Sequence, residues 1–447
     1  MFKKSLAIIL STVLCFSVSG CNFSSTKVDD MLNAPKPSGD LYNIQTALEK
    51  YVGGSVDLRY PRSGEYRSAF VLQDIDNDGI DEAFAFYGTK NDDNTTLMHI
   101  NMINCIEDKW VSASDIQMQS SGVDCIKFCD LDGDGIMEVV VGWNKYSVLG
   151  RELTVFSINS GKLVQRMQVN YSVFSLCDIN SDGVTEIVTV YLNSVEKSSI
   201  AKAFVIDKSG VLDRGSCMLD GTVLSYDEPT ISKLKTGQIA IYIDATKGAA
   251  GMITELIYWK NDGITNPFYD TTTYQNITTL RSSTTRCTDF NGDGILNIPF
   301  MEALPSVAST SDSEKAYMTY WEECDGTDFS KIAVTVMNYV DGYYFEIPSD
   351  WVHNFTIVRK LDSKQRIFYH WNQKTLSTCE ELLRIQVFSI IEWENSKSNY
   401  DNYFEVARDE TNVYVMKLGD SSVLTLDQQT IVNGFHILNT SKGETIN

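Results

Sequence analysis

A nine-residue acidic segment that recurs along the chain constrains the fold more than any other feature. Its clearest copy, DLDGDGIME, starts at Asp130 and runs directly into the apolar sequence VVVGW. Further copies start at Asp74 (DIDNDGIDE), Asp178 (DINSDGVTE) and Asp289 (DFNGDGILN), and each is followed by apolar residues. The chain therefore carries four versions of one loop, each placed before a strand-like stretch.

The segment that starts at Asp130 places oxygen atoms in a pattern that suits a hard cation. Calcium takes six to eight oxygen ligands at about 2.3–2.6 Å, and side chains at alternate positions of a tight loop can converge on one point. Gly135 permits the sharp turn, since a residue without a Cβ adopts positive φ at little cost. The expected ligands in this copy are the side chains of Asp130, Asp132, Asp134 and Glu138 and the carbonyl of Ile136.

The residues that follow each loop argue against a helix–loop–helix calcium site. Such a site needs a bidentate carboxylate at its twelfth position. Counted from the first aspartate, that position holds Ala85, Val141, Thr189 or Phe300, none of which carries a carboxylate. The same absence argues against a dockerin module. Short runs rich in β-branched and aromatic residues follow instead, so we expect strand–calcium loop–strand units.

The spacing of the copies indicates a repeat of about 50 residues. The first aspartates lie 56, 48 and 111 residues apart, so the last interval has room for one more unit. At Ile231–Ile243 the strand–turn–strand outline reappears with lysines in place of carboxylates, and this copy cannot bind a cation; a lysine ammonium could fill part of that space. The period predicts a mainly β fold, a β-propeller of about five four-stranded blades, in which the sequence does not identify the closing blade.

Strands that carry D-x-D-x-D-G-x-x-E loops at this period resemble the FG-GAP or VCBS repeats, which also form the β-propeller head of integrin α-chains. The resemblance covers roughly Glu65 to Tyr344 and implies calcium as the bound ion. The first two loops offer four carboxylates each, the third three and the last two, so affinity should fall in that order. The metal ligands predicted over all four loops are Asp74, Asp76, Asp78, Ile80, Glu82, Asp130, Asp132, Asp134, Ile136, Glu138, Asp178, Asn180, Asp182, Val184, Glu186, Asp289, Asn291, Asp293, Ile295 and Asn297.

The N-terminus carries the signature of a bacterial lipoprotein. Two lysines precede an apolar run from Leu6 to Val18, which is shorter than the roughly 20 residues that span a bilayer. We expect residues 1–20 to be a signal peptide, Cys21 to be diacylated, and residues 21–40 to form a flexible tether. The residues before the first loop also resemble those of uncharacterised VCBS-repeat lipoproteins of Gram-positive bacteria. That resemblance implies a lipid anchor on the outer face of the cytoplasmic membrane.

Charge and cysteine usage indicate an extracellular protein that does not bind nucleic acid. The 59 acidic and 37 basic residues give a net charge of −22, and such a surface repels a phosphate backbone. The clustered loop carboxylates repel one another without a cation, so metal binding should couple to folding. Ten cysteines are present, of which Cys15 and Cys21 belong to the signal and the lipid site. For the other eight we favour buried free thiols over disulfides.

The chain is expected to divide into a repeat region and a smaller C-terminal domain. Apolar residues at helical spacing predict a helix from Leu41 to Val52 that caps the repeats, so that residues 41–344 hold this helix and the propeller. Residues 345–447 are expected to form a small α+β domain. Its predicted elements are strands at 384–390 and 413–416, a short helix capped by Ser377 and Glu380, and a final helix at 426–438.

No catalytic motif is found in the sequence. The four histidines are isolated from one another, and the G-x-S-x-G, G-x-x-x-x-G-K-[ST] and G-x-G-x-x-G patterns are missing. Nearly all clustered carboxylates are predicted calcium ligands, so a glycosidase pair has no specific support. Aromatic residues such as Trp143, Tyr146, Tyr258 and Trp259 could form a carbohydrate platform, but packing between blades is the favoured interpretation.

Two hypotheses from different classes remain. The favoured one is a non-catalytic binding module, tethered outside the membrane, whose partner is a protein or carbohydrate at the cell surface. The alternative is an extracellular enzyme that acts on a cell-wall or other polysaccharide through the central channel of the propeller. Convergent carboxylates in that channel that are not calcium ligands would favour the enzyme hypothesis, and a closed apolar channel would exclude it.

Overall fold

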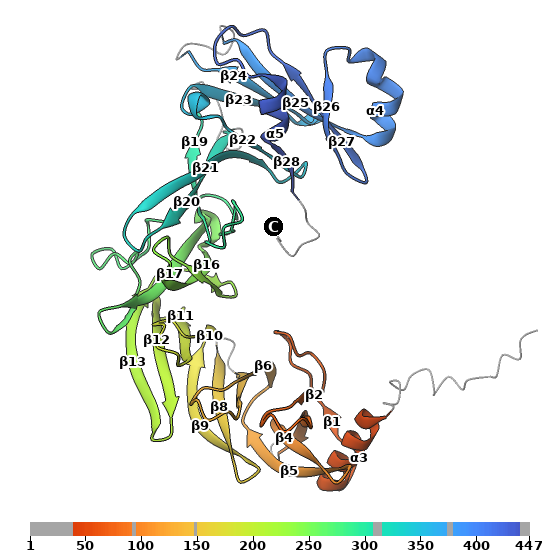
Figure 1. Cartoon of the computed structure of the whole chain (residues 1–447), viewed down its shortest axis with the longest axis vertical. Helices are drawn as coiled ribbons and strands as arrows, with labels where there is room; N and C mark the ends of the chain where they lie inside the picture. Colours follow the sequence, from red (N-terminus) through yellow and green to blue (C-terminus); the bar gives the residue numbers. More distant parts are fainter. Residues whose placement is uncertain (1–38, 92–94, 147–149, 307–314, 373–378, 439–447) are drawn as a thin grey trace, which may run out of the picture.

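The computed structural model describes residues 39–91, 95–146, 150–306, 315–372 and 379–438. These residues form a mainly β structure of six antiparallel sheets, which follow one another in chain order along an arc (Figure 1). The predicted signal peptide, the lipid site at Cys21 and most of the tether lie outside the described residues. Within the described ranges, no helix is both long and apolar enough to cross a membrane.

The first sheet is preceded by the predicted helix, which is confirmed. This helix ends at Gly53, whose φ of 83° is the left-handed conformation that glycine adopts easily. The residues before the first acidic loop pair with the residues after it, as expected of a strand–loop–strand unit. The elements are α3 Asp40–Val52, β1 Asp57–Leu58, β2 Phe70–Gln73, β3 Glu82–Lys90, β4 Thr96–Ile106 and β5 Lys109–Met118.

The second and third sheets are four-stranded meanders with the same loop position. In each, the acidic loop joins the first strand to the second, and the next two strands follow as a hairpin. The second sheet holds β6 Gly122–Cys129, β7 Glu138–Asn144, β8 Arg151–Asn159 and β9 Lys162–Tyr171. The third holds β10 Val173–Cys177, β11 Glu186–Asn193, β12 Ser198–Asp207 and β13 Gly210–Leu219.

The fourth and fifth sheets depart from this regular pattern. The fourth contains the predicted lysine-bearing unit, in which β15 pairs with β16, and is built from β14 Ser225–Tyr226, β15 Thr230–Lys233, β16 Ile239–Thr246, η1 Gly248–Ala250, β17 Met252–Lys260 and β18 Gly263–Thr265. Before the fourth acidic loop only a single bridge, Thr288 to Asn297, replaces the entering strand. The fifth sheet is β19 Ile298–Ala303, β20 Tyr317–Cys324, β21 Phe329–Asn338, β22 Tyr343–Glu346 and β28 Phe435–Ile437.

The sixth sheet has the strand order β23-β24-β25-β27-β26. The strands predicted at 384–390 and 413–416 are found as parts of β25 and β27, except that Ile390 belongs to α4 and not to the strand. The elements are η2 Ser349–Trp351, β23 Phe355–Lys360, η3 Leu361–Ser363, β24 Gln365–His370, β25 Glu381–Ser389, α4 Ile390–Ser396, η5 Lys397–Asn399, β26 Phe404–Arg408, β27 Asn412–Leu418 and α5 Gln428–Asn433.

Three expectations for the C-terminal region need correction. The short helix expected after Ser377 and Glu380 is not found among the described residues, because Glu381–Ser389 form β25; Ser377 lies outside those residues. The short helix of this region is α4, whose N-cap Ser389 accepts from the Glu392 N–H. The final helix is only α5, because Gly434 ends it and the next residues pair with β22 as β28. The domain boundary expected after Tyr344 falls inside β22, so the two predicted regions share one sheet.

The sheets stack face to face, because alternate residues of one strand point to opposite neighbours. In β7, Val139 and Val141 pack with Phe84 and Phe86 of the first sheet, whereas Val140 packs with Ile187 of the third. In the third, fourth and fifth sheets, too, one face packs against the preceding sheet and the other against the following one. Burial of about 25 cal/mol for each square ångström of apolar surface makes these interfaces the main source of stability.

The two ends of the stack are covered by other elements. On the first sheet, Ile44 and Leu48 of α3 pack against the face that does not meet the second sheet. On the sixth sheet, Trp393 of α4 packs against Phe388 and Val413. In Figure 1 these end sheets lie far apart, and in the described chain no strand pairing joins them. The arrangement of the described residues is therefore an arc with capped ends, in which no strand closes a ring.

Candidate calcium-binding loops

The four acidic loops share one backbone conformation. Their sixth residue is always glycine, with φ between 85° and 90° at Gly79, Gly135, Gly183 and Gly294. The N–H of that glycine donates to the carboxylate of the first aspartate at 2.8 to 3.0 Å. Each loop is thus wound around its first side chain, and this contact holds the later side chains near it.

The loop at Asp130 brings three predicted ligands together. Carboxylate oxygens of Asp130, Asp132 and Glu138 lie within 4.8 Å of one another. The fourth acidic side chain, Asp134, is oriented by its own backbone contact, in which it accepts from the Ile136 N–H at 2.8 Å. Oxygens held this close by covalently separate side chains repel one another unless a cation lies between them.

The loop at Asp74 gives the most direct indication of a metal. Oxygens of Asp74, Asp76 and Asp78 again lie within 4.8 Å of one another. One of them, Oδ1 of Asp74, is buried and accepts no hydrogen bond in the described structure. A buried carboxylate oxygen without a partner is costly, and a bound Ca²⁺ would satisfy it. The residues present therefore fit the ion that the sequence predicts.

The glutamate that closes each of the first three loops is buried and tied to the backbone. Glu82, Glu138 and Glu186 accept from the N–H of the second loop residue at 3.2, 2.8 and 3.0 Å. Burial is the main cause that raises the pKa of Glu82 and Glu186 to about 7, and the neighbouring aspartates add to it. Burial also raises the pKa of Glu138. Without a cation these side chains resist ionisation.

The third loop replaces one aspartate with Asn180. The Asn180 amide donates to Asp182 at 3.0 Å and to Glu186 at 2.8 Å, while its Oδ1 accepts from the Asp182 N–H at 2.8 Å. An amide in this position offsets part of the repulsion that the second loop leaves uncompensated. The third loop consequently has one carboxylate fewer to neutralise than the first two.

The fourth loop gains a carboxylate that sequence reasoning did not assign to it. Asn297 keeps the backbone role of the missing glutamate, since its Oδ1 accepts from the Phe290 N–H at 2.7 Å, but it brings no charge. Glu323 of β20 contacts Asp293 and Asn291 of the loop and is 4% exposed. Burial and the Asp293 carboxylate raise the pKa of Glu323. The loop thus has three carboxylates, one of them from the neighbouring strand.

Strand register explains why Glu323 was missed. Ile298, directly after the loop, pairs with Glu322, so the next residue of β20 lies beside the end of the loop. The sequence separates these residues by an insertion whose residues 307–314 lie outside the described structure. Only the pairing of β19 with β20 reveals the contact, and no local pattern around Glu323 signals it.

The four predicted carbonyl ligands lie at the seventh position of each loop. Their N–H groups donate to the fifth residue at 2.8 to 2.9 Å, which fixes the peptide on one side of the loop. Ile80, Ile136, Val184 and Ile295 therefore remain predicted ligands.

The lysine-bearing unit forms its turn without any carboxylate. Gly237 has φ of 88°, and its N–H donates to the Leu234 carbonyl at 2.8 Å. Lys235 extends toward the fourth loop, where its Nζ lies 3.9 Å from Oε2 of Glu323. Its ammonium therefore faces the carboxylate of the neighbouring repeat.

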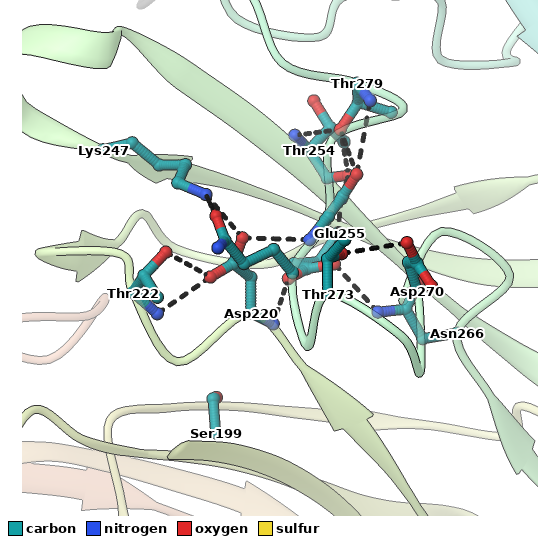
Figure 2. A network of polar contacts seen from close by, with 12 residues as sticks. Ser199, Asp220, Thr222, Lys247, Thr254, Glu255, Asn266, Asp270, Thr273 and Thr279 are labelled. Carbon is teal, nitrogen blue, oxygen red and sulfur yellow. Dashed lines mark hydrogen bonds and ion pairs between the residues drawn. The ribbon is translucent and has the colours of Figure 1, made fainter. Parts of the chain in front are cut away.

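Two further carboxylates converge outside the loops, one in the connection after β13 and one in β17 of the fourth sheet (Figure 2). Asp220 accepts from Lys247 Nζ at 2.7 Å, and Glu255 accepts from the Asp220 N–H at 2.7 Å and from the amides of Asn266 and Asn276 at 2.8 and 3.1 Å. Both carboxyl side chains are fully buried. Burial raises the pKa of Glu255 to about 7. The network fastens the segment after β18 onto the sheet.

The aromatic and cysteine expectations are partly met. Trp143 and Tyr258 are buried between sheets, as the packing interpretation requires, whereas Tyr146 is 54% exposed. The thiols of Cys105, Cys125, Cys129, Cys177, Cys217, Cys287 and Cys324 are free. Burial is the main cause that raises the pKa of Cys125 to about 11, so it behaves as a small apolar residue.

Comparisons with known proteins leave the family open. No protein-family model and no curated protein matches the chain. Similar solved structures include the rhamnogalacturonan lyase PL11 of Bacillus licheniformis, at 9% identity over 84% of this chain and 93% of that one, with a TM-score of 0.30. The β-propeller domain of the Trilobed protease from Pyrococcus furiosus is 10% identical over 72% and 90%, with a TM-score of 0.26. Scores this low carry no argument about fold or activity.

Proposed function

We propose that this protein is an extracellular binding module whose repeats are stabilised by calcium. The observation that supports the metal best is the loop at Asp74, where three carboxylates converge and the buried Oδ1 of Asp74 accepts no hydrogen bond. A bound calcium ion would coordinate that oxygen and neutralise the charge of the cluster. The same backbone recurs in the other three loops, and Glu323 is proposed as an additional ligand of the fourth.

The finer architecture is part of the same proposal. The first five sheets are blades of the FG-GAP or VCBS type, and the sixth sheet with its helices covers the last of them. Adjacent loops touch each other, since the Asn77 amide donates to the Gly135 carbonyl at 3.1 Å. A cation that orders one loop therefore also supports the packing of the next blade.

The location follows from the N-terminal sequence alone. A signal peptide over residues 1–20 and a diacylated Cys21 would place the stack on the outer face of a bacterial cytoplasmic membrane. Calcium loops suit that location, because extracellular modules bind calcium with dissociation constants of about 10⁻⁴ to 10⁻³ M. The partner would be a protein or carbohydrate at the cell surface.

The enzyme alternative gains no support from the carboxylates outside the loops. Asp220 and Glu255 converge, but both are fully buried and their oxygens accept hydrogen bonds from Lys247, backbone and asparagine groups. A general acid or base must reach the proton that it transfers. These two groups face other protein atoms, and their role is to hold the fold together.

The decisive experiment measures bound calcium and thermal unfolding on the chain from Asn22 onward. We expect three or four bound Ca²⁺ ions and a fall in Tm of about 10 °C or more after chelation, since each site saturated a hundredfold above its Kd contributes about 2.7 kcal/mol. A chain that binds no calcium and keeps its Tm in chelator would overturn the proposal.

A further inference from the structure

A polar cavity of about 410 Å³ opens at the ends of the second, third and fourth sheets. It lies at the end of the strands opposite to the acidic loops: β7 leaves its loop at Glu138 and reaches the cavity at Asn144 and Tyr146. β11 likewise runs from Glu186 toward the cavity residue Leu192. The cavity is therefore independent of the predicted metal ligands, and its volume falls within the range of about 300–1,000 Å³ of small-molecule sites.

The charges that line this cavity are opposite in sign to the charge of the chain. Arg62, Lys145 and Arg151 line it, and among the residues that the structure describes no aspartate or glutamate does. Two of these cations have acidic partners behind them: Arg151 donates to Asp124 at 3.0 Å, and Lys145 lies 2.8 Å from Glu152. Even with both partners counted, the site keeps one positive charge in a protein of net charge −22.

Arg62 is the cation left for a ligand. Its backbone is fixed, since the Arg62 N–H donates to the Asp124 carbonyl at 2.8 Å. Among the described residues, no hydrogen bond or ion pair is found for its guanidinium, which is exposed. A guanidinium on a fixed backbone can bind an oxyanion with two parallel hydrogen bonds.

Arg151 is held in place by buried groups. Asp124 is 7% exposed, and besides Arg151 it accepts from the Tyr171 hydroxyl at 2.5 Å. The guanidinium of Arg151 lies 5.6 Å from the centre of the Tyr171 ring. A second cavity of about 210 Å³ shares Arg151 and Tyr171, and it is lined by two more cations, Arg67 and Lys127, and by two carboxylates, Asp124 and Glu228. The lining without carboxylates is therefore that of the first cavity, and Arg151 borders both cavities.

The remaining lining is suited to hydroxyl groups. Besides the three cations it has eleven residues, of which five carry small polar side chains, and two others, Tyr146 and Leu224, are exposed. Hydroxyl and amide side chains pair with sugar hydroxyls, while an exposed ring can cover the apolar face of a sugar. The small polar lining residues are Ser121, Asn144, Ser172, Ser194 and Ser225.

We propose that this cavity binds an anionic glycan, with Arg62 and Arg151 on its acidic group and the hydroxyl-bearing side chains on its sugar hydroxyls. This inference deepens the proposed binding role by naming the ligand class, and it does not depend on the calcium loops. A long nucleic acid is disfavoured by the overall charge. The acidic group is a carboxylate, as in a uronic acid, or a phosphate, as in a phosphate-linked polyol chain.

Calorimetric titration of the calcium-loaded chain from Asn22 onward tests this assignment. The probes are digalacturonate, a glycerol-phosphate dimer and neutral digalactose. We expect one or both anionic probes to bind and the neutral probe to bind at least tenfold more weakly. Preference for digalacturonate assigns the carboxylate source, and preference for the glycerol-phosphate dimer assigns the phosphate source. Raising the salt concentration should weaken binding of either, because exposed charges are screened.

The matched variants are Arg62→Gln and Lys162→Gln. Arg62→Gln should weaken binding of the anionic probe about tenfold, which is the effect expected from the loss of one charge-assisted hydrogen bond. Lys162→Gln removes an equal charge from an exposed turn at the far end of the second sheet and should leave affinity unchanged. Equal binding of neutral and anionic probes, no binding of any probe, or unchanged affinity in Arg62→Gln would overturn the ligand class. If calcium still raises the Tm in that case, the proposed role of calcium holds although the proposed ligand class does not.

Discussion

The loop at Asp130 and the turn at Gly237 occupy equivalent places in the second and fourth sheets, yet they differ in charge. Both contain a glycine of nearly equal φ, 89° at Gly135 and 88° at Gly237. Both touch a neighbouring repeat: the Gly135 carbonyl accepts from Asn77, and Ser232 beside the other turn donates to the Gly294 carbonyl at 3.1 Å. The turn therefore requires a glycine and no metal. Dependence on calcium should arise only where carboxylates have gathered.

The largest effect is expected from neutralising the first ligand of a strong loop. Asp130→Asn should remove one bound calcium and lower the Tm in calcium by about 5 °C, since the variant loses one site's contribution of about 2.7 kcal/mol. Asp289→Asn, in the loop with fewer carboxylates of its own, should cost less. Calorimetry of both variants with and without calcium checks the order. Equal losses in the two variants would contradict the ranking of the loops.

The next effect is a pH dependence of the calcium-free protein. Glu82 and Glu186 have a pKa of about 7 in the folded chain, against 4.5 as the ordinary value. Between these values the folded state holds protons that the unfolded state has released, so stability falls as pH rises from about 5 to 7. Tm measured after calcium removal should fall over this range. In the Glu82→Gln variant part of this fall in Tm should remain, because Glu255 also has a pKa of about 7.

Calcium should flatten that profile. A bound cation favours the charged carboxylates and replaces the protons of Glu82 and Glu186. The Tm difference between calcium and calcium-free samples should thus be small at pH 5 and large at pH 7.5. A difference that is constant with pH would show that these glutamates are not ligands.

A smaller and more local effect is expected at the fourth loop. Glu323→Gln should weaken calcium binding there about tenfold and leave the other sites unchanged, because only this loop receives a carboxylate from β20. Glu322→Gln changes the adjacent residue of the same strand and is the matched control. A calcium titration that also counts the bound ions distinguishes the two variants. Loss of affinity at the first two loops in Glu323→Gln would count against a local role.

The smallest effect is expected from the lysine-bearing turn. Lys235→Gln removes an ammonium that is 3.9 Å from Glu323 and nearly half exposed. An ion pair this long with one exposed partner is worth about 0–1 kcal/mol, so the Tm should change by no more than about 2 °C. A much larger fall, present with and without calcium, would show that the lysine takes over the role of a cation in this repeat.

The sequence allowed the loops and the strands beside them to be predicted because both depend on residues close in the chain. The glycines, the alternating acids and the β-branched runs after them fix a strand–loop–strand unit locally. Glu323 could not be predicted, because it reaches its loop only through the pairing of β19 with β20. The cationic residues of the cavity could not be predicted for the same reason, because Arg62, Lys145 and Arg151 come together only through the stacking of sheets.

The C-terminal errors have a different physical origin. Residues 426–438 show helical spacing, but Gly434 ends α5 and Phe435 pairs with Phe345 of β22. Burial in the fifth sheet outweighs a helix propensity that differs by less than about 1 kcal/mol for each residue. The capping box found at Ser389 and Glu392 was recognisable in the sequence, yet the strand prediction that ended at Ile390 obscured it.

The capped ends of the stack affect how such a chain can change in length. A closed ring fixes its number of blades, because every blade must meet two others at a set angle. Here α3 covers one terminal face and the sixth sheet covers the other, so each internal sheet meets only its two neighbours, as in a solenoid. Duplication or loss of one internal unit would lengthen or shorten the arc without leaving a gap. The length of the arc is then a property that evolution can adjust one repeat at a time.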